Sequence, residues 1–250
     1  MSAPLIGTAG WSIPAAVADQ FPESGSHLAR YAQRLTAVEI NSSFYRSHQA
    51  NTYARWADTV PDAFRFSVKL PKTITHDRRL VSADDLRDRF LDEVAALGAK
   101  LGPVLVQLPP SLDFDPAIAG AFFEGLRQRF EGQIACEPRQ GGWFTDAADA
   151  LLASLQVARV AADPALNVRA AAPGGWHGLA YRRLHGAPKV YYSDYARPNL
   201  DALARQLSTQ AVATDCWCIL DNTALGLATP NALYLQEILT PARSPTEVNF

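Results

Sequence analysis

The 250-residue sequence is poor in cysteine and has almost no excess of charge of either sign. Its three cysteines are Cys136, Cys216 and Cys218, and an odd, small number predicts no disulfide framework. Cys216 and Cys218 lie two residues apart in an apolar run, but without a second cysteine cluster this pair is a weak zinc signal. We interpret all three thiols as packing groups, because free cysteine is commonly buried as a small hydrophobe.

The balance of charge excludes a broad basic surface. The chain carries 23 Lys and Arg residues and 25 Asp and Glu residues, a formal net charge of −2. Proteins that follow a long nucleic-acid backbone usually show a basic excess. A nucleic-acid partner is therefore not favoured, whereas a local basic site for a small anionic ligand is compatible with the composition.

Long apolar runs are missing as well. None approaches the ~20 residues that cross a bilayer, and Met1–Gly10 lacks the basic segment and apolar stretch of a secretory leader. We expect a cytoplasmic protein without a membrane partner. The residues do not fix its oligomeric state.

Short β-rich runs alternate with stretches of helical periodicity along the whole chain. Apolar residues make up 48% of the sequence, and most runs are apolar through the middle. Parallel strands that are covered by helices have this character. The eight runs are Leu5–Gly10, Ala37–Asn41, Phe64–Lys69, Pro103–Leu108, Gln133–Glu137, Ala158–Asp163, Leu179–His185 and Cys216–Asn222.

Several of the intervening stretches carry helix-start signals. Asp115-Pro116 and Thr229-Pro230 each place a capping residue before a proline. Thr145 and Ser82 are further N-cap candidates, the latter with Asp85 in a capping-box-like spacing. Three less regular segments read as βα loops with short helical pieces: Ser12–Ser24, Pro71–Val81 and Asn167–Gly178.

Strict alternation of strands and helices predicts a parallel α/β fold. Eight strands in 250 residues favour a closed TIM-type (β/α)₈ barrel, a single domain over residues 1–250. An open, doubly wound sheet is the alternative. The chain has no GxGxxG or GxxxxGK[ST] motif, so the usual nucleotide loops of open sheets are missing and no cofactor is predicted.

The predicted strands end in polar or aromatic residues. Residues two apart on a strand share a face, so Glu39 and Asn41 point together. The same holds for Glu137 with Arg139 and for Arg183 with His185. Catalytic groups of such barrels lie at the carboxyl ends of the strands. The other candidates at these ends are Trp11, Tyr45, Lys69, His76, Gln107, Trp143 and Asn222.

Structural roles compete with these functional interpretations. Glu39, Glu137, Arg139 and Arg183 can equally form an ion-pair ring that closes the barrel top. His185 can be a hydrogen-bonded core histidine, and the three aromatic residues Trp11, Tyr45 and Trp143 can plug the mouth or wall a pocket.

Seven stretches of the chain resemble the YecE-like family, also called domain of unknown function 72. That family is known as a TIM-type barrel, so the resemblance implies the same fold. The stretches are GTAGW (7–11), VEINSSFYR (38–46), FRFSVKLPKTITH (64–76), LGPVLVQLPPSL (101–112), CEPR with Trp143, YRRLHG (181–186) and LDNTALGLATPNA (220–232).

The resemblance implies a site but no activity. The recurrent polar positions of the family match Glu39, Asn41, Tyr45, Lys69, Thr75, His76, Gln107, Glu137, Arg139, Arg183, His185 and Asn222. This chain departs from the pattern at three positions: Gln140 stands where a histidine is usual, Asp221 where the first Asn of a pair is usual, and Pro138 where an apolar residue is usual.

Three hypotheses about function follow. The first is an enzyme, with hydrolase or lyase chemistry favoured, that acts on an anionic ligand bearing phosphate or carboxylate. Lys69, Arg139 and Arg183 would supply positive charge, with Asn41, Tyr45, Gln107 and Asn222 as further substrate-binding residues. Glu137 or Glu39 would be the base and His185 or His76 the acid.

The second hypothesis is a metal-assisted phosphodiesterase or endonuclease-like enzyme on nucleic acid, by fold-level analogy alone. No dedicated metal ligand is predicted, but a divalent metal could draw on Glu39, His76, Glu137, Asp163, His185 and Asp221. The third hypothesis is a non-catalytic ligand-binding barrel with the same pocket.

Overall fold

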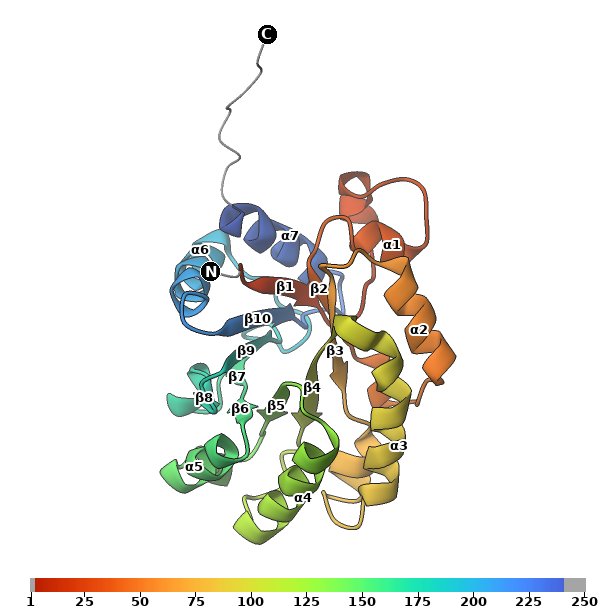
Figure 1. Cartoon of the computed structure of the whole chain (residues 1–250). Helices are drawn as coiled ribbons and strands as arrows, with labels where there is room; N and C mark the ends of the chain where they lie inside the picture. The colour runs from red at the N-terminus through yellow and green to blue at the C-terminus, as the bar shows by residue number, and fades with distance from the viewer. Residues whose placement is uncertain (1–2, 241–250) are drawn as a thin grey trace.

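A computed structural model describes residues 3–240, and its centre is a ring of parallel strands surrounded by helices (Figure 1). All eight predicted strands are confirmed. They are β1 (Leu5–Thr8), β2 (Ala37–Ile40), β3 (Arg65–Lys69), β4 (Leu101–Gln107), β5 (Ile134–Glu137), the divided strand β6 (Val157–Arg159) and β7 (Ala161–Asp163), β9 (Leu179–Leu184) and β10 (Asp215–Leu220). They pair as two sheets, in the orders β2-β3-β4-β5-β6 and β1-β10-β9-β7.

Two seams join these sheets. At one seam the sixth strand serves both, because β6 pairs with β5 while β7 pairs with β9. Val160 lies between β6 and β7 and donates its N–H to the Cys136 carbonyl at 2.8 Å. At the other seam Ala9 forms a parallel bridge with Glu39, and the Gly10 N–H donates to the Glu39 carbonyl at 2.9 Å. The fold is thus a TIM-type (β/α)₈ barrel, and the alternative of an open sheet is wrong.

Gly7 allows β1 to lie close against β2 at this second seam. A Cβ atom built on Gly7 would lie 2.2 Å from the Ala37 carbonyl oxygen, far inside van der Waals contact. Only glycine permits this approach without moving one of the strands.

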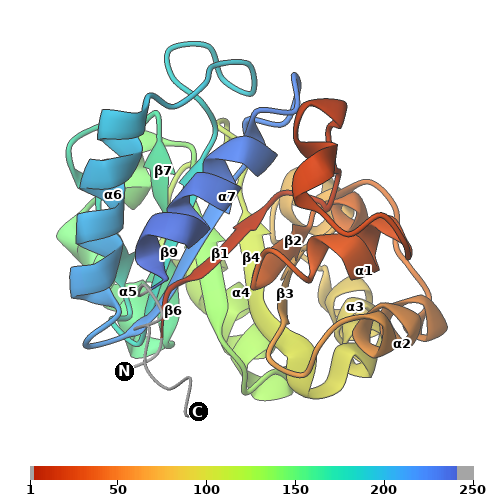
Figure 2. The ribbon, with the colours of Figure 1, turned by 90° about the horizontal axis from the view of Figure 1, so that it is seen from above.

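The helices cover the outside of the ring, and Figure 2 shows the loops after β9 and β10 at one end of it. Asp115 and Thr145 cap their helices as predicted, through side-chain bonds to N–H groups of the first turn. The other two predicted caps are wrong. The N-cap of the third helix is Ala83, while Thr229 lies inside the last helix and donates to the Ser12 carbonyl. The helices are α1 (His27–Tyr31), α2 (Ala50–Thr59), α3 (Asp84–Val94), α4 (Pro116–Arg129), α5 (Asp146–Ser154), α6 (Arg197–Gln210) and α7 (Ala228–Leu239).

The three less regular segments are βα loops with short helical turns, as predicted. They contain η1 (Ala15–Gln20), the π-helical turn η3 (Thr73–Asp77) and η6 (Arg169–Ala171). In the sixth unit η6 and the two-residue strand β8 (Gly174–Gly175) stand in place of an α-helix.

Apolar side chains fill the lower part of the barrel interior. Leu105, Ala135, Trp217 and Ile219 pack there, and the ring of Tyr181 stacks on Trp217 with centroids 6.0 Å apart. Because inward positions repeat every second residue, the next inward side chains toward the carboxyl ends are the polar ones. These apolar side chains therefore form an apolar floor beneath the charged layer, and this floor excludes water from that side of the layer.

The three cysteines are free and buried, which confirms their packing role. Among residues 3–240 no helix is long and apolar enough to cross a membrane. The cytoplasmic location stays a prediction.

Candidate active site at the barrel mouth

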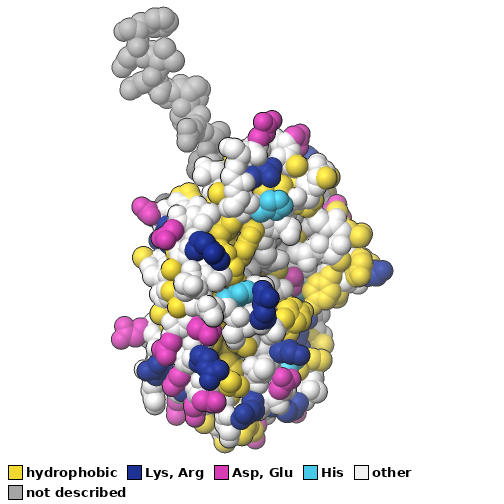
Figure 3. Space-filling model, turned by 90° about the vertical axis from the view of Figure 1, so that its right-hand side faces the viewer, with side chains coloured by type: hydrophobic (Ala, Val, Ile, Leu, Met, Phe, Trp, Pro, Cys, Tyr) yellow, Lys and Arg dark blue, Asp and Glu magenta, His cyan; other side chains and the backbone are white. Residues whose placement is uncertain are grey.

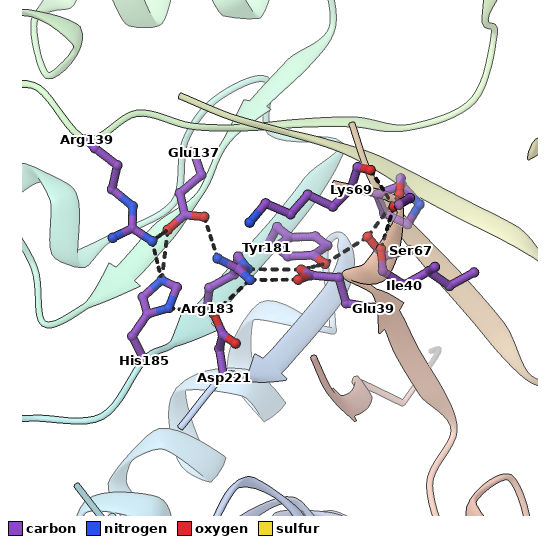
Figure 4. Close-up of polar contacts among 12 residues, drawn as sticks. Glu39, Ile40, Ser67, Lys69, Glu137, Arg139, Tyr181, Arg183, His185 and Asp221 are labelled. Atoms are coloured by element: carbon purple, nitrogen blue, oxygen red, sulfur yellow. Dashed lines mark hydrogen bonds and ion pairs between the residues drawn. The ribbon is translucent and has the colours of Figure 1, made fainter. Parts of the chain in front are cut away.

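Five strands deliver charged side chains to one layer above the apolar floor, and four of these side chains form a bonded network (Figure 4). Glu39 comes from β2, Lys69 from β3 and Glu137 from β5, while Arg183 comes from β9 and Asp221 directly follows β10. Parallel strands of a closed barrel end at one face, so side chains far apart in sequence meet there.

Arg183 lies at the centre of the network and binds three carboxylates. Its Nε and Nη2 atoms contact the two oxygens of Glu39 at 2.9 and 2.7 Å. Its Nη1 donates to Glu137 Oε2 at 2.7 Å, and Nη2 also donates to Asp221 Oδ2 at 2.9 Å. Arg183, Glu39 and Glu137 are each at most 1% exposed. This is the ion-pair arrangement that the sequence left open as an alternative.

His185 bridges two of these carboxylates. Its Nε2 lies 2.8 Å from Glu137 Oε1, and its Nδ1 lies 2.9 Å from Asp221 Oδ2. Arg139 Nη2 approaches the same Glu137 oxygen at 2.7 Å and lies 3.0 Å from His185 Nε2. Both oxygens of Glu137 are therefore occupied by cationic or potentially cationic nitrogens.

These partners keep two of the carboxyl groups ionised. Burial alone would raise the pKa of Glu137, but Arg183, Arg139 and His185 hold it well below its usual range. Burial would likewise raise the pKa of Asp221, and Arg183 with His185 outweighs it, so that the pKa is lowered. A carboxylate held in this way is a weak base, because it gives up its ion pairs when it accepts a proton.

A hydroxyl layer separates the network from the apolar floor. Tyr181 lies 3.0 Å from Glu39 Oε2 and 2.9 Å from Ser67 Oγ through its hydroxyl. Ser67 Oγ in turn donates to the Pro103 carbonyl at 3.0 Å. Tyr181 and Ser67 thus tie the carboxylate of Glu39 to neighbouring strands.

Lys69 differs from the other buried charges of this site. It is 7% exposed, yet its Nζ makes no ion pair or hydrogen bond with any residue in the range 3–240. The ammonium lies over the ring of Phe44, 4.0 Å from its centroid. Burial, followed by the charge of Arg183, lowers the pKa of Lys69 to about 8, although Glu39, Glu137 and Asp221 act in the opposite direction. In Figure 4 the Lys69 side chain extends from the end of β3 toward the side where Glu137 and Arg183 lie.

A cavity of about 720 Å³ opens above this network and is walled by charged and apolar side chains together. Lys69, Arg139 and His76 contribute to its wall, and Lys72 lies on it as well. The remaining wall residues are Phe44, Tyr45, Asp77, Gln107, Pro110, Pro138, Phe144, Ala162, Pro164, Ala165, Leu166, Ala170 and Tyr191. Such a volume suits a small molecule.

His76 and Lys69 lie against the same aromatic ring. The His76 ring meets Phe44 edge-on with centroids 5.0 Å apart, and its Nδ1 lies 2.8 Å from Thr75 Oγ1. Burial and the charge of Lys69 lower the pKa of His76. The imidazole is therefore held toward its neutral form.

The loop after β9 closes one side of the cavity. It turns at Gly186 (φ +91°), and the Tyr191 N–H donates to the His185 carbonyl. Asn222 holds the far end of this loop by donating to the Ser193 carbonyl at 3.0 Å. The Asn222 side chain thus supports the wall without lining the cavity.

The other predicted ligand-binding residues divide into two groups. Tyr45 and Gln107 line the cavity, Tyr45 at its exposed rim. Trp143 lies outside the wall, because its ring is buried against Phe114 and its Nε1 donates to the Leu112 carbonyl. Trp11 packs edge-on against Trp56, and Asn41 precedes the short turn η2 (Ser42–Phe44), so neither lines the cavity.

Several residues of the site were not predicted from the sequence. Ser67 and Tyr181 precede Lys69 and Arg183 by two residues, so the same spacing rule could have found them. Phe44 lies inside the quoted stretch VEINSSFYR, but nothing local marks it as the platform for Lys69. Tyr191 belongs to a loop whose path no sequence signal indicates.

The six candidate metal ligands do not converge on a vacant position. Across the described residues no group of three or more His, Cys, Asp or Glu side chains is arranged to hold a metal ion. The Arg183 guanidinium itself lies between Glu39, Glu137 and Asp221, where a cation would otherwise be held. On the face that Figure 3 shows, Lys and Arg side chains are interspersed with Asp and Glu, without a broad basic region.

The chain is thus a (β/α)₈-barrel protein with a buried charge network and an open cavity at the barrel mouth. It matches the family described as "Protein of unknown function DUF72" over residues 5–249 and belongs to that family. The resemblance inferred from the sequence motifs is confirmed.

Relatives support the same assignment. The UPF0759 protein YecE of Escherichia coli K12 is 35% identical over 82 residues, 33% of this chain and 30% of YecE. The UPF0759 protein YunF of Bacillus subtilis 168 is 28% identical over 148 residues, 56% of this chain and 52% of YunF. The chain spans about half the length, or less, of these curated relatives. The crystal structure of a DUF72 family protein from Enterococcus faecalis V583 shares the fold with a TM-score of 0.81 at 21% identity, over 98% of this chain and 99% of that one.

Proposed function

We propose that the barrel binds a small anionic molecule in the mouth cavity and that Lys69 gives and takes the proton in an acid–base reaction on it. The observation that carries this proposal is the contrast between Lys69 and Arg183. The guanidinium is saturated by three carboxylates, whereas the buried ammonium faces the cavity without an anionic partner among residues 3–240. A buried charge that the protein leaves unpaired is costly, and a bound anion would remove that cost.

Arg139 and Lys72 extend the positive wall around Lys69. The side chain of Arg139 is 28% exposed, and only its Nη2 is engaged with Glu137. Its Nε is buried and has no hydrogen-bond partner in the described part of the chain. Guanidinium groups bind carboxylate and phosphate through paired N–H groups. We therefore assign the anionic group of the ligand to Arg139 and Lys69.

The protonation state of Lys69 suits proton transfer near neutral pH. With its pKa at about 8, the amine exists in both forms between pH 7 and 9. General acids and bases work best when their pKa lies near the working pH. His76 on the same wall is the second group that can hold a proton.

In this proposal the carboxylates have a structural role, and neither Glu137 nor Glu39 is the base that the sequence suggested. Glu137 is a weak base because Arg183, Arg139 and the hydrogen-bonded His185 hold its pKa low. Both oxygens of Glu39 accept hydrogen bonds from Arg183, which fixes this carboxylate against the guanidinium. In this proposal Glu39, Glu137 and His185 position Arg183 and Arg139, and the chemistry belongs to Lys69 and His76.

Titration with sulfate tests the proposal, since sulfate keeps a constant charge between pH 6 and 10. Calorimetry on the full chain should show one site whose affinity falls as the pH rises through about 8. Lys69→Met should abolish this binding, whereas Lys69→Arg should retain it and lose the dependence on pH. Lys189→Met is the control, because Lys189 is exposed and does not line the cavity. Absence of binding to the wild type, or equal binding to Lys69→Met, contradicts the proposal.

A further inference from the structure

Lys69 differs from the other lysines of the chain in its position relative to the mouth cavity. The chain contains four lysines: Lys69, Lys72, Lys100 and Lys189. Lys100 pairs with Asp62, while Lys72 and Lys189 are exposed. Lys69 alone of the four is both buried and on the cavity wall.

The backbone around Lys69 is held rigidly relative to the ring beneath its amine. Ser43 donates its hydroxyl toward the Lys69 carbonyl at 2.6 Å and the Ile40 carbonyl at 2.9 Å. Ser43 immediately precedes Phe44, whose ring lies 4.0 Å from the Lys69 Nζ. The amine and its aromatic platform are therefore fixed to each other before a ligand arrives, which favours attack in one orientation.

We propose that Lys69 forms a Schiff base with the carbonyl group of an anionic aldehyde or ketone, so that this compound class is the substrate of the site. This inference rests on the proposed function, because Arg139 would hold the carboxylate or phosphate of the same molecule. The Phe44 ring supports the covalent state as it supports the free ammonium. Both the ammonium and the iminium carry one positive charge, and an aromatic face attracts either.

The step balances without an oxidant or a reductant. The neutral amine of Lys69 attacks the carbonyl carbon, a C–N bond forms, and a proton passes from nitrogen to oxygen to give a carbinolamine. The hydroxyl then takes one further proton and leaves as water, while the nitrogen lone pair forms the C=N bond. Since the pKa of Lys69 is about 8, about one molecule in ten carries the neutral amine at pH 7.

The cavity also supplies what the dehydration step requires. Phe44, Pro138, Phe144 and Leu166 make part of its wall apolar, which limits the water that would hydrolyse an iminium. His76 meets the same Phe44 ring edge-on, at a centroid distance of 5.0 Å. Its imidazole lies on this wall and can relay the proton to the leaving hydroxyl.

Reductive trapping tests the inference directly. The full chain is incubated at pH 7.5 with sodium cyanoborohydride and either pyruvate or dihydroxyacetone phosphate, and the modified peptide is located by mass spectrometry. We expect a single adduct on Lys69 with at least one probe, formed at least tenfold faster than on the other three lysines. Carboxylate and phosphate carbonyl compounds are thereby distinguished.

Variants separate this inference from the proposed function. Lys69→Arg should still bind sulfate but form no adduct at position 69, and Lys189→Met should react like the wild type. Circular dichroism checks that each variant is folded. Absence of a Lys69 adduct with both probes, while sulfate binding still depends on Lys69, overturns the Schiff base and leaves the proposed function standing. Equal labelling of all four lysines also overturns it. A Lys69 adduct without any sulfate binding supports the Schiff base and contradicts the anion site.

Discussion

The ammonium of Lys69 lies over the face of the Phe44 ring, 4.0 Å from its centroid. This contact with the ring takes the place of an ion pair with a carboxylate. A cation over an aromatic face gains roughly 0.5–2 kcal/mol, depending on its desolvation. Phe44 therefore supports the charged form of an amine that burial destabilises.

Replacement of Phe44 by leucine should lower the pKa of Lys69 further. Leucine keeps the site apolar but removes the π face, so the ammonium loses its attraction while it stays desolvated. Titration of Lys69 by NMR in the Phe44→Leu variant checks this. A pKa that rises toward 10.5 would mean that the ring mainly excludes water and does not stabilise the charge.

Removal of the central guanidinium should destabilise the barrel strongly. Arg183→Met leaves Glu39, Glu137 and Asp221 buried around an apolar side chain. Removing one partner of a buried ion pair costs about 3–5 kcal/mol of stability. Denaturant unfolding at pH 7 measures the loss.

The adjacent residue provides the control for that variant. Arg182 contacts Gln210 and the Ala171 carbonyl, both neutral partners. Arg182→Met should cost about 1 kcal/mol, as loss of ordinary hydrogen bonds does. Equal losses for the two arginines would contradict the central role of Arg183.

Acid should weaken the fold through Glu137 and Asp221. Both groups have pKa values in the folded state below their ordinary values of 4.5 and 3.8. A depressed folded-state pKa contributes stability that is fully present above the unfolded pKa and is lost as the pH falls through the folded pKa. The free energy of unfolding should therefore fall steadily below about pH 4.5. The Glu137→Gln variant should be less stable at pH 7, and its free energy of unfolding should fall less steeply as the pH is lowered. The same steepness in the variant and the wild type would count against the ion pairs.

Gly7→Ala should disrupt the seam between β1 and β2. The added methyl would lie 2.2 Å from the Ala37 carbonyl oxygen, so one strand must move, at a cost of about 1–3 kcal/mol or more. Gly141→Ala is the matched control, because a Cβ at Gly141 meets nothing within 4 Å. Thermal unfolding compares them, and similar melting temperatures would refute the close approach at the seam.

Much of the fold was readable from the sequence because barrel strands combine two local signals. Each strand is a short apolar run, and polar residues such as Glu137 and Arg183 stand at or near its carboxyl end. Two of the predicted helix caps are wrong: the φ of Ser82 is +49°, outside the extended N-cap conformation, and Thr229 donates to the Ser12 carbonyl in the loop after the adjacent strand β1. Neither backbone path nor a distant partner is visible in a four-residue motif.

The residues at the barrel mouth were largely predictable from the sequence, but their individual roles were not. The spacing rule placed Glu39, Glu137, Arg183 and His185 on the inward face, and they do meet. Which cation each carboxylate binds depends on ångström-scale distances between strands that sequence spacing does not encode. For the same reason the sequence could not show that Arg183 binds all three carboxylates and that Lys69 binds none of them.

The central claim is that Lys69 is a buried amine without a carboxylate partner among residues 3–240, and the pKa of this amine tests the claim most directly. Reductive ¹³C-methylation followed by NMR titration resolves the four lysines, and Lys69→Arg assigns the resonance. The charges of Arg183, Glu39, Glu137 and Asp221 all act on the pKa of this amine. The account predicts a midpoint near pH 8 for Lys69, well below the ordinary lysine value of 10.5. A midpoint at or above 10.5 would show a paired or solvated ammonium and would contradict the proposed chemistry.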